Sequence, residues 1–306
     1  MSPPVLLTGA SGLLGRHLQP ALVRRGEVIG LGGPGSSGDG LRHLDLADAA
    51  AVVDCLDQVK PAIVVHAAAM ANVDACERHP ALAWKNNVLA TRNLIDWCIR
   101  QRAAPYFVYI STDQLYDGPG PHDEAAPNPI NVYALTKLWA EDLIRQLPSH
   151  LILRLNYVAL PLPDLRRGFV SWLIDSLSEG RAITLFDDVF FNPLYAADAV
   201  ELLAELVEMR AKGLLNFGAS GAGISKAGYG LALAEMLGLS RDAVTVGSVA
   251  QSALAAARPQ DMRMGISRLS QQLGRTPPDI QAGLRSLAKD WRIREFNQTI
   301  RRSSEY

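Results

Sequence analysis

The sequence contains few cysteines and no long hydrophobic run. Its 306 residues include three cysteines, Cys55, Cys76 and Cys98, and none of them belongs to a CxxC pair. This odd number, with no basic residue before Arg16 to begin a signal peptide, indicates free thiols in a reducing compartment. No apolar stretch approaches the roughly 18 residues of a membrane-spanning helix. We therefore expect a cytoplasmic protein, and a chain of this length excludes a small disulfide module.

The sequence also lacks an excess of charge of either sign. Lys and Arg number 30 and Asp and Glu number 31, which gives a formal net charge of −1. Such a chain has no surplus of cations for a nucleic acid or an anionic membrane, so neither is expected as a partner. No His, Cys or Asp cluster has the spacing of a zinc site, and no GxSxG motif indicates a serine hydrolase. The sequence thus gives no metal ligands.

The first half of the chain repeats a short apolar run followed by a helical pattern. This rhythm is typical of parallel strands joined by crossover helices. The loops at 32–40 and 117–129 contain little to bury, so we expect both to be exposed and mobile. The expected strands are Val5–Thr8, Glu27–Leu31, Ile63–Ala67, Tyr106–Ile110 and Leu151–Leu155, and the expected helices are Gly12–Arg25, Ala47–Gln58, Pro80–Arg102 and Asn131–Leu147.

The rhythm changes after about residue 160. Turns containing proline are followed by helical patterns near Gly168–Glu179 and Ala196–Arg210 and by a short strand at Gly213–Phe217. We therefore predict an α/β fold with a doubly wound parallel sheet. Its main domain covers residues 1–160 with a return near 183–218, and a smaller α+β lobe covers 161–182 and 219–306 on the substrate side.

A glycine-rich turn joins the first strand to the first helix. The order of strand, glycine turn and helix is the context that a dinucleotide-binding fingerprint requires. Gly9 permits the tight turn, Gly12 lets backbone amides approach a pyrophosphate, and Gly15 lets the helix pack close to the strand. The main domain is therefore predicted to be an NAD(P)-binding Rossmann domain. The residues predicted around the cofactor are Gly9, Ser11, Gly12, Leu13, Leu14 and Gly15.

Tyr133 and Lys137 form a YxxxK pair on the expected helix 131–147. Their i, i+4 spacing places both side chains on one helix face, where they can meet one ligand. A free tyrosine has a pKa of about 10 and transfers protons poorly at neutral pH. The neighbouring ammonium favours the phenolate, so we expect Lys137 to lower the pKa of Tyr133.

The GxxGxxG turn, the Ser111-Thr112 pair and the YxxxK pair together resemble the short-chain dehydrogenase/reductase family. The resemblance implies that Tyr133 protonates a substrate carbonyl oxygen during reduction and that Thr112 hydrogen-bonds the same oxygen. It also implies that Lys137 holds the ribose hydroxyls of the nicotinamide. Tyr133 and Lys137 are therefore both expected to contact the cofactor as well as the substrate. It further implies that Asn87 holds a water molecule in the proton relay. A plain surface amide is the alternative for Asn87.

Two further stretches are similar to the family's contacts with adenosine. Asp45-Leu46 resembles the pair that bonds the adenine amino group, although the residues alone also allow Asp45 to be a helix cap. Ala67, Ala68 and Ala69 resemble the turn of small residues beside the adenosine ribose.

The end of the second strand bears on the choice between NAD and NADP. It reads Leu31-Gly32-Gly33 and offers no acid to bind a ribose 2′-hydroxyl or to repel a 2′-phosphate. Arg16 and Arg42 are the cations that can approach such a phosphate. We therefore expect NADPH rather than NADH. Asp39 in the following loop argues against this choice, because an acid there could bind the 2′-hydroxyl of NADH.

The stretch from Ser111 to Gly118, STDQLYDG, resembles the STDxVFDG of dTDP-4-dehydrorhamnose reductases. Sugar-nucleotide dehydratases carry Thr-Asp-Glu at this place. Gln114 stands where that acid would be and cannot exchange a proton, so dehydration is disfavoured. The resemblance implies NAD(P)H-dependent reduction of the 4-keto group of a nucleotide-diphosphate deoxysugar.

The same resemblance suggests four substrate contacts. Asp113, Gln114 and Asn156 are expected beside the sugar. The stretch Arg258-Pro259-Gln260-Asp261 resembles the RPxD by which extended family members bind nucleotide phosphate, so Arg258 is expected to pair with the diphosphate. A surface arginine ahead of a helix is the alternative for Arg258.

Two other functions stay open on the sequence. The first is a non-catalytic, NADP-binding regulatory subunit, because the beta subunit of methionine adenosyltransferase has the same GLLGR glycine loop. A non-catalytic protein would be free to lose the proton donor, whereas this chain keeps Tyr133 and Lys137. A sugar-nucleotide epimerase would hold NAD tightly through purification. In each of these readings a homodimer is a candidate assembly.

Overall fold

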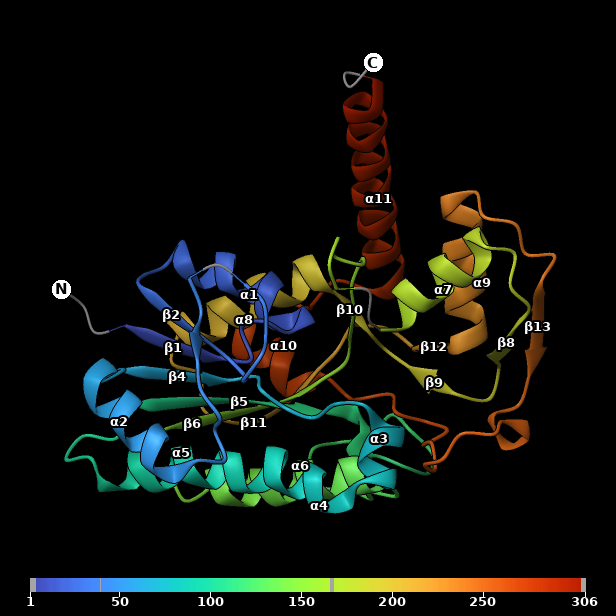
Figure 1. Cartoon of the computed structure of the whole chain (residues 1–306). Coiled ribbons are helices and arrows are strands. Elements are labelled where there is room, and N and C mark those ends of the chain that lie inside the picture. Colours follow the sequence, from blue (N-terminus) through green and yellow to red (C-terminus); the bar gives the residue numbers. More distant parts are fainter. Residues whose placement is uncertain (1–3, 39, 166–167, 304–306) are drawn as a thin grey trace.

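The structure is a computed structural model that describes the backbone of residues 4–38, 40–165 and 168–303, with side chains as far as Phe296. Its centre is a sheet of seven strands, and every neighbouring pair runs parallel. The strand order is β3-β2-β1-β4-β5-β6-β11, in which the chain starts at the middle and winds outward in both directions (Figure 1). The strands are β1 (Val5–Thr8), β2 (Val28–Gly32), β3 (Arg42–His43), β4 (Ile63–His66), β5 (Tyr106–Thr112), β6 (His150–Leu155) and β11 (Gly213–Phe217).

Helices cover both faces of this sheet. One face packs against α1 (Leu13–Val23) and α8 (Ala196–Glu208), and the other packs against α2 (Ala49–Val59), α5 (Ala90–Arg100) and α6 (Val132–Ile144). Successive strand residues point to opposite faces, so both must be apolar. In β1, Leu7 joins the first core and Leu6 joins the second. The predicted doubly wound parallel sheet is confirmed.

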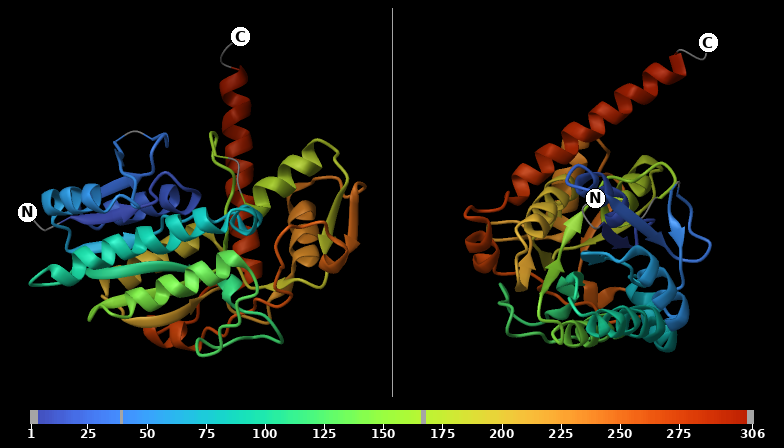
Figure 2. Two further views of the ribbon diagram at one scale, coloured as in Figure 1. Left: turned by 60° about the horizontal axis from the view of Figure 1, so that its bottom comes forward. Right: turned by 90° about the vertical axis from the view of Figure 1, so that its left-hand side faces the viewer.

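A smaller lobe lies at the carboxyl ends of the strands (Figure 2). In it β8 (Ile183–Phe186) pairs with β13 (Val244–Gly247), and β9 (Phe190–Phe191) pairs with β12 (Ile224–Ser225). Because β8 and β9 pair inside the lobe, the chain does not return to the main domain near residue 183 as expected. It returns at β10 (Leu194–Tyr195), which pairs with β7 (Tyr157–Val158). The helices of the lobe are α7 (Phe169–Ser178) and α9 (Lys226–Leu237).

The last two helices were not anticipated. Leu269 and Leu273 of α10 (Ser267–Leu273) are buried in the core beside β11, so part of the segment assigned to the lobe belongs to the main domain. The long α11 (Ile280–Ser303) begins against α9 and β10 and then runs away from the body of the molecule (Figure 2). None of the helices in the described ranges is both long and apolar enough to cross a membrane.

The helix expected over Pro80–Arg102 is divided into three parts. It consists of α4 (Pro80–Trp84), a π turn over Lys85–Leu89, and α5, and it follows the short α3 (Val73–Arg78). A π turn inserts an extra residue into an α-helix and is frequent at functional sites. Here it contains Asn87, whose side chain is buried.

The loop at 117–129 is largely exposed, as expected, but two of its side chains are not. His122 and Glu124 are buried, because the backbone amide of His122 donates to the Arg263 oxygen at 2.7 Å and a carboxylate oxygen of Glu124 accepts the backbone amide of Asn216 at 3.0 Å. His122 also stacks on Tyr116 with ring centroids 4.9 Å apart. Arg263 and Asn216 lie far along the sequence, so the composition of the loop could not reveal these two partners.

Candidate cofactor and active site

The glycine turn after β1 is shaped by close backbone contact. Gly9 has φ +70°, and a Cβ atom there would lie 2.6 Å from the backbone nitrogen of Ala68. A Cβ atom on Gly15 would lie 2.1 Å from the Gly9 oxygen. Both positions therefore require glycine. Gly12 precedes α1 with no side-chain cap, which leaves the first amides of the helix available to an anion.

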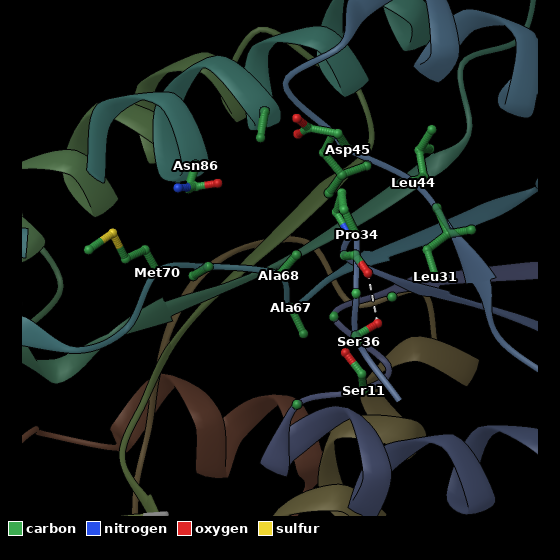
Figure 3. Close-up of a pocket in the computed structure, with 18 of the residues that line it drawn as sticks. Ser11, Leu31, Pro34, Ser36, Leu44, Asp45, Ala67, Ala68, Met70 and Asn86 are labelled. Atoms are coloured by element: carbon green, nitrogen blue, oxygen red, sulfur yellow. Dashed lines mark hydrogen bonds between the residues drawn. The ribbon is translucent and has the colours of Figure 1, made fainter. Parts of the chain in front are cut away.

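A cavity of about 620 Å³ opens beside this turn (Figure 3). Its walls come from the glycine turn, from the loop at 33–37 after β2, from the segment before α2, and from the loop that follows β4. Most of the predicted cofactor residues line it, namely Gly9, Ser11, Gly12, Asp45, Leu46, Ala67, Ala68 and Ala69. The structure therefore brings together residues from the amino ends of three separate crossover segments.

Five of the predicted cofactor residues do not line this cavity, and Tyr133 and Lys137 are two of them. Leu14 is buried in the core, and Gly15 packs against the glycine turn itself. Leu13 begins α1 and is half-buried. In the structure the roles of Leu14 and Gly15 are packing roles, because α1 is pressed directly onto the sheet.

Asp45 faces the cavity with a carboxylate that is already hydrogen-bonded. One oxygen accepts the Ala47 amide at 2.9 Å, and the other lies 3.3 Å from the Lys85 ammonium. These bonds hold the pKa of Asp45 below its usual range, so it is an anion and a hydrogen-bond acceptor. The cap of α2 is Asp48, which accepts from the amides of Ala50 and Ala51.

His66 is a positioning residue that sequence reasoning did not single out. It is fully buried at the end of β4 and bridges two hydroxyls, with Thr8 at 2.7 Å and Thr91 at 2.9 Å. Burial lowers its pKa to about 3, so the ring is neutral. Thr8 in turn accepts the Ala68 amide, and this chain fixes the glycine turn against the β4 loop. A histidine at the end of an apolar strand was the only sequence signal.

Thr112, Tyr133 and Lys137 meet at the carboxyl end of β5. Thr112 ends this strand, while Tyr133 and Lys137 lie on α6, which packs against β5 and begins at the cap residue Asn131. All three side chains are buried. The side chains of Tyr133 and Thr112 are hydrogen-bonded, and the Lys137 ammonium donates to the Ile110 oxygen at 2.7 Å.

The expected lowering of the Tyr133 pKa is not found. Burial raises that pKa above its ordinary value, with Asp113 adding to the effect and the Thr112 hydrogen bond opposing it. The reason is that the Lys137 ammonium is turned to the Ile110 oxygen and lies 4.1 Å from the centre of the Tyr109 ring. Tyr133 is therefore a neutral phenol that carries a proton to donate.

Lys137 is itself strongly affected by its surroundings. Burial lowers the pKa of its ammonium to about 7, while the nearby Glu141 carboxylate opposes that shift. A group with such a pKa changes its charge near neutral pH. Any second positive charge beside it would favour the neutral amine, and any anion would favour the ammonium.

Asn87 connects the loop after β4 to α6. Its amide oxygen accepts the Met70 amide at 2.8 Å, and its amide nitrogen donates to the Thr136 hydroxyl at 2.9 Å and to the Met70 oxygen at 3.2 Å. Thr136 is the neighbour of Lys137 on α6. These partners are protein groups, so the geometry gives Asn87 a positioning role, and its bond to a relay water stays a prediction.

Asp113 and Asn156 form a buried polar pair beside Thr112. The Asn156 amide donates to one Asp113 oxygen, and the Thr112 hydroxyl lies 3.3 Å from the other. Burial raises the pKa of Asp113 to about 6, although Lys226 and these hydrogen bonds oppose the shift. Gln114 follows in a short 3-10 turn (Asp113–Leu115) and donates its amide to the Met262 sulfur at 2.8 Å.

A second cavity, of about 480 Å³, lies between the main domain and the smaller lobe. Gln114 and Arg258 line it, as the sequence suggested for the substrate side, and so does Lys226, which the sequence analysis missed. Asp113 and Asn156 lie behind its wall and do not line it. Arg258 is already paired with Asp74 at 2.7 Å.

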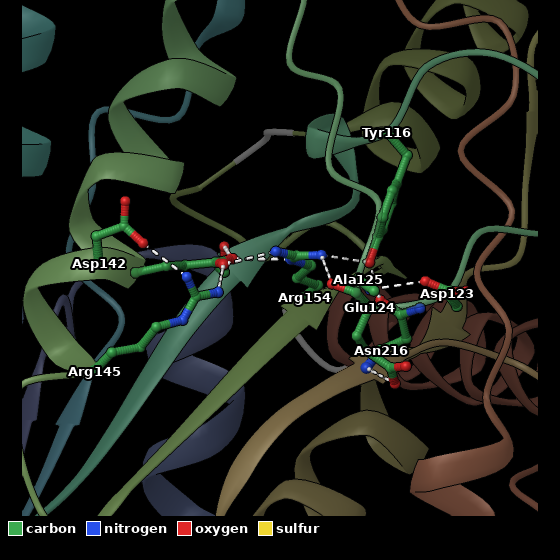
Figure 4. A network of polar contacts seen from close by, with 10 residues as sticks. Tyr116, Asp123, Glu124, Ala125, Asp142, Arg145, Arg154 and Asn216 are labelled. Carbon is green, nitrogen blue, oxygen red and sulfur yellow. Dashed lines mark hydrogen bonds and ion pairs between the residues drawn. The ribbon is translucent and has the colours of Figure 1, made fainter.

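A buried ion-pair network holds α6 against the sheet (Figure 4). Arg154 on β6 donates to both oxygens of Glu141 on α6, at 3.0 and 2.8 Å, and Ser111 donates to Glu141 at 2.6 Å. Arg154 also donates to the Tyr116 hydroxyl and to the Glu124 backbone oxygen. Glu141 lies one helical turn after Lys137, so the network fixes the helix that carries Tyr133 and Lys137.

Comparison with known proteins agrees with this geometry. A family model described as RmlD substrate binding domain matches residues 3–293. The probable low-salt glycan biosynthesis reductase Agl14 of Haloferax volcanii is 30% identical over 291 residues, which cover 92% of this chain and 96% of that protein. The methionine adenosyltransferase 2 subunit beta of Xenopus tropicalis is 31% identical over 221 residues, or 67% of this chain and 62% of that protein.

A solved structure agrees in fold over almost the whole length. The dTDP-4-dehydrorhamnose reductase of Bacillus anthracis, crystallised in complex with NADP, has a TM-score of 0.83 and 25% identity, and the match covers 95% of this chain and 100% of that one. The family match and the shared architecture cover both the main domain and the lobe. The chain therefore belongs to the RmlD family and has the fold of the extended short-chain dehydrogenases/reductases.

Proposed function

We propose that the protein is an NAD(P)H-dependent oxidoreductase that reduces the 4-keto group of a nucleotide-diphosphate deoxysugar. The observation that carries the proposal is the convergence of Thr112, Tyr133 and Lys137 at one end of β5. Reductases among the relatives support the redox class. Gln114 supports reduction over dehydration, because an amide cannot act as an acid or base in elimination.

The residues of the first cavity fit a nicotinamide dinucleotide. The glycine turn presents uncapped helix amides to a diphosphate, Asp45 offers an acceptor to an adenine amino group, and Ala67 and Ala68 leave space for a ribose. A bound cofactor of this kind supplies the hydride. Tyr133 and Lys137 stand farther along the same edge of the sheet, where the ribose next to the nicotinamide would be held.

The chain's own contribution is proton transfer and charge stabilisation. Tyr133, kept protonated by burial, donates its proton to the substrate oxygen as negative charge develops there. The Thr112 hydroxyl hydrogen-bonds the same oxygen. The Lys137 ammonium, one helical turn away, stabilises the phenolate that remains. Asn87 and the Arg154–Glu141 pair keep the three groups in place.

We propose NADPH as the preferred cofactor. The described loop after β2 presents no carboxylate to the cavity, while Ser36, Ser37 and Arg16 line it. Arg16 pairs at the rim with the exposed Asp164 at 2.5 Å, and such a surface pair exchanges readily for a phosphate. Arg42 does not line the cavity, and Asp39 lies outside the described residues. The Michaelis constants for NADPH and NADH test this preference directly.

The test of the activity uses the purified chain with NADPH or NADH and a panel of 4-keto sugar nucleotides, followed by the loss of NADPH absorbance. We expect Tyr133→Phe to lower kcat by about 100-fold or more, because the proton donor is lost. NADPH binding, measured by its fluorescence, should stay unchanged. Tyr106→Phe removes a phenol bonded to the Ala211 oxygen, far from the site, and serves as the matched control. A wild-type chain that oxidises NADPH with none of these sugars contradicts the proposal.

The second candidate is a non-catalytic regulatory subunit. The likeness to the methionine adenosyltransferase subunit supports it. Such a protein would bind NADPH without turnover and would co-purify with an enzyme partner. An epimerase, in contrast, would retain NAD through purification, which mass spectrometry of the purified protein detects. The intact Tyr133, Lys137 and Thr112 favour catalysis over the regulatory reading.

A further inference from the structure

The second cavity is mostly apolar but contains two cationic side chains. Aromatic and aliphatic groups from α7, β8 and the segment at 249–262 form most of its wall. The cations are Arg258, near the end of that segment, and Lys226, the first residue of α9. The apolar part includes Phe169, Trp172, Leu185, Val189, Leu254 and Met262.

The charge of Arg258 is already compensated by the protein. Its guanidinium donates to an Asp74 oxygen at 2.7 Å and to the Ala256 oxygen at 3.0 Å. The other Asp74 oxygen accepts the Ala256 amide at 3.0 Å, so the carboxylate is fixed in this pairing. An incoming anion would have to compete with Asp74 for this guanidinium.

Lys226 has no such partner. Its ammonium lies 3.4 Å from the centre of the Phe191 ring and 4.9 Å from that of Phe169. Among the described residues, no carboxylate is within ion-pair distance of it, and Asp113 acts on it only from farther away. Burial lowers its pKa to about 8, which leaves it cationic at neutral pH. A cation in an apolar wall gains strongly from a bound anion.

Gln114 supplies an independent sign that this cavity takes a polar ligand. Its amide oxygen is buried and has no hydrogen-bond partner in the described part of the chain, while its nitrogen is used by the Met262 sulfur. A buried acceptor without a donor is costly, and a ligand hydroxyl would satisfy it. The cavity therefore combines an unpaired cation, an unpaired acceptor and an apolar wall.

We propose that Lys226 is the principal anion-binding residue of this cavity and holds the diphosphate of the substrate, with Gln114 accepting a hydrogen bond from a hydroxyl of the same molecule. The inference rests on the proposed function for the identity of the ligand. A neutral ligand would leave Lys226 uncompensated, whereas a nucleoside diphosphate brings two phosphate charges to it. Arg258 then has a supporting role, because Asp74 shares its guanidinium.

The test is calorimetric titration of the full chain with dTDP and with UDP. We expect Lys226→Met and Lys226→Gln to raise the dissociation constant about 30-fold, because a buried charge pair is lost. Lys226→Arg should retain most of the affinity. Arg241→Gln removes a cation of the same lobe that lies outside the cavity, pairs with Glu235 at 3.6 Å and is exposed, so it controls for the general field. NADPH fluorescence checks that each variant is folded.

Four results would overturn the proposal. They are unchanged affinity in both Lys226→Met and Lys226→Gln, equal losses in these variants and in Arg241→Gln, a loss confined to Arg258→Gln, and failure of the wild-type chain to bind either nucleoside diphosphate. The measurement needs no turnover. A chain that binds dTDP through Lys226 but reduces no keto sugar would therefore contradict the proposed activity and leave this inference standing.

Discussion

Lys137 shows, at the scale of one residue, how a buried lysine opposes stability. Its side chain is 2% exposed, and its ammonium has one hydrogen-bond acceptor, the Ile110 oxygen, and one aromatic ring, that of Tyr109. The fall of its pKa to about 7 reports that burial disfavours the charged form. The sequence predicted the residue from its YxxxK spacing, but it could not predict this cost, which arises from strand β5 beneath it.

We predict that Lys137→Met increases the free energy of unfolding while it abolishes reduction. The folded pKa lies below the unfolded value of about 10.4, so the lysine destabilises the fold below pH 7 and this penalty disappears as the pH rises toward 10. The expected gain is about 2 kcal/mol at pH 7 and smaller at pH 9.5. Urea denaturation at both pH values measures it.

The control for this prediction is Lys212→Met. Lys212 is exposed, so its replacement should change stability by less than about 0.5 kcal/mol at either pH. A Lys137→Met variant that is less stable than the wild type at pH 7, or whose gain grows with pH, would show that the ammonium is well compensated in the fold.

At the scale of elements, α6 is the helix that positions the proposed proton donor Tyr133 and its neighbour Lys137. It presents Tyr133 and Lys137 from its first two turns and is tied to the sheet by Glu141 and Arg154, both fully buried. Ser111 donates a further bond to Glu141. The Tyr116 hydroxyl accepts one from Arg154 (Figure 4). A shift of this helix would therefore displace the proton donor as well as the core.

We predict that Glu141→Gln costs about 3–5 kcal/mol in stability, because Arg154 is left as a buried charge without a carboxylate. The double replacement Glu141→Leu with Arg154→Met should recover a large part of this loss. Denaturation of the single variants Glu141→Leu and Arg154→Met and of the double variant forms a thermodynamic cycle. Asp142→Asn, which breaks the exposed pair with Arg145, should cost at most about 1 kcal/mol. Equal costs for the two sites would contradict the prediction.

The same elements show what the sequence could and could not predict. The strands and crossover helices of the main domain followed from their periodicity, and the strand Gly213–Phe217 was predicted with the residues it has in the structure. The π turn at 85–89 was not predicted, because residues 80–102 were assigned to one continuous helical pattern. The partners of Glu124, Arg154 and Lys226 come from distant segments, and spacing along the chain contains no information about them.

At the scale of the whole molecule, one surface stands out for its exposed apolar side chains. Trp84 on α4 and Trp139 on α6 are 45% and 55% exposed, and their ring centroids are 5.6 Å apart. Leu82 and Leu135 on the same two helices are also exposed. Exposed apolar side chains that pack on each other can form part of an interface, and a symmetric pairing of two copies would bury the Trp84–Trp139 pair of each copy against the other.

We therefore predict that the protein is a homodimer and that Trp139→Glu converts it to a monomer. Analytical ultracentrifugation at micromolar concentration measures the mass of both forms. The control is Phe296→Glu, which introduces the same charge at another exposed apolar side chain. Phe296 is 66% exposed on α11, and this variant should leave the dimer intact. A wild-type monomer, or dissociation by Phe296→Glu alone, would contradict the prediction.

The direction of α11 has a practical consequence. Its first turns are anchored by the buried Leu284 and Leu287 and by a bond from Tyr195 to Asp290, and the later turns extend away from the body (Figure 1). Neither cavity includes residues of this helix. A fluorescent label or a support for immobilisation attached beyond Phe296 would stand clear of both entrances, so ligands could reach an enzyme tethered by its carboxyl end.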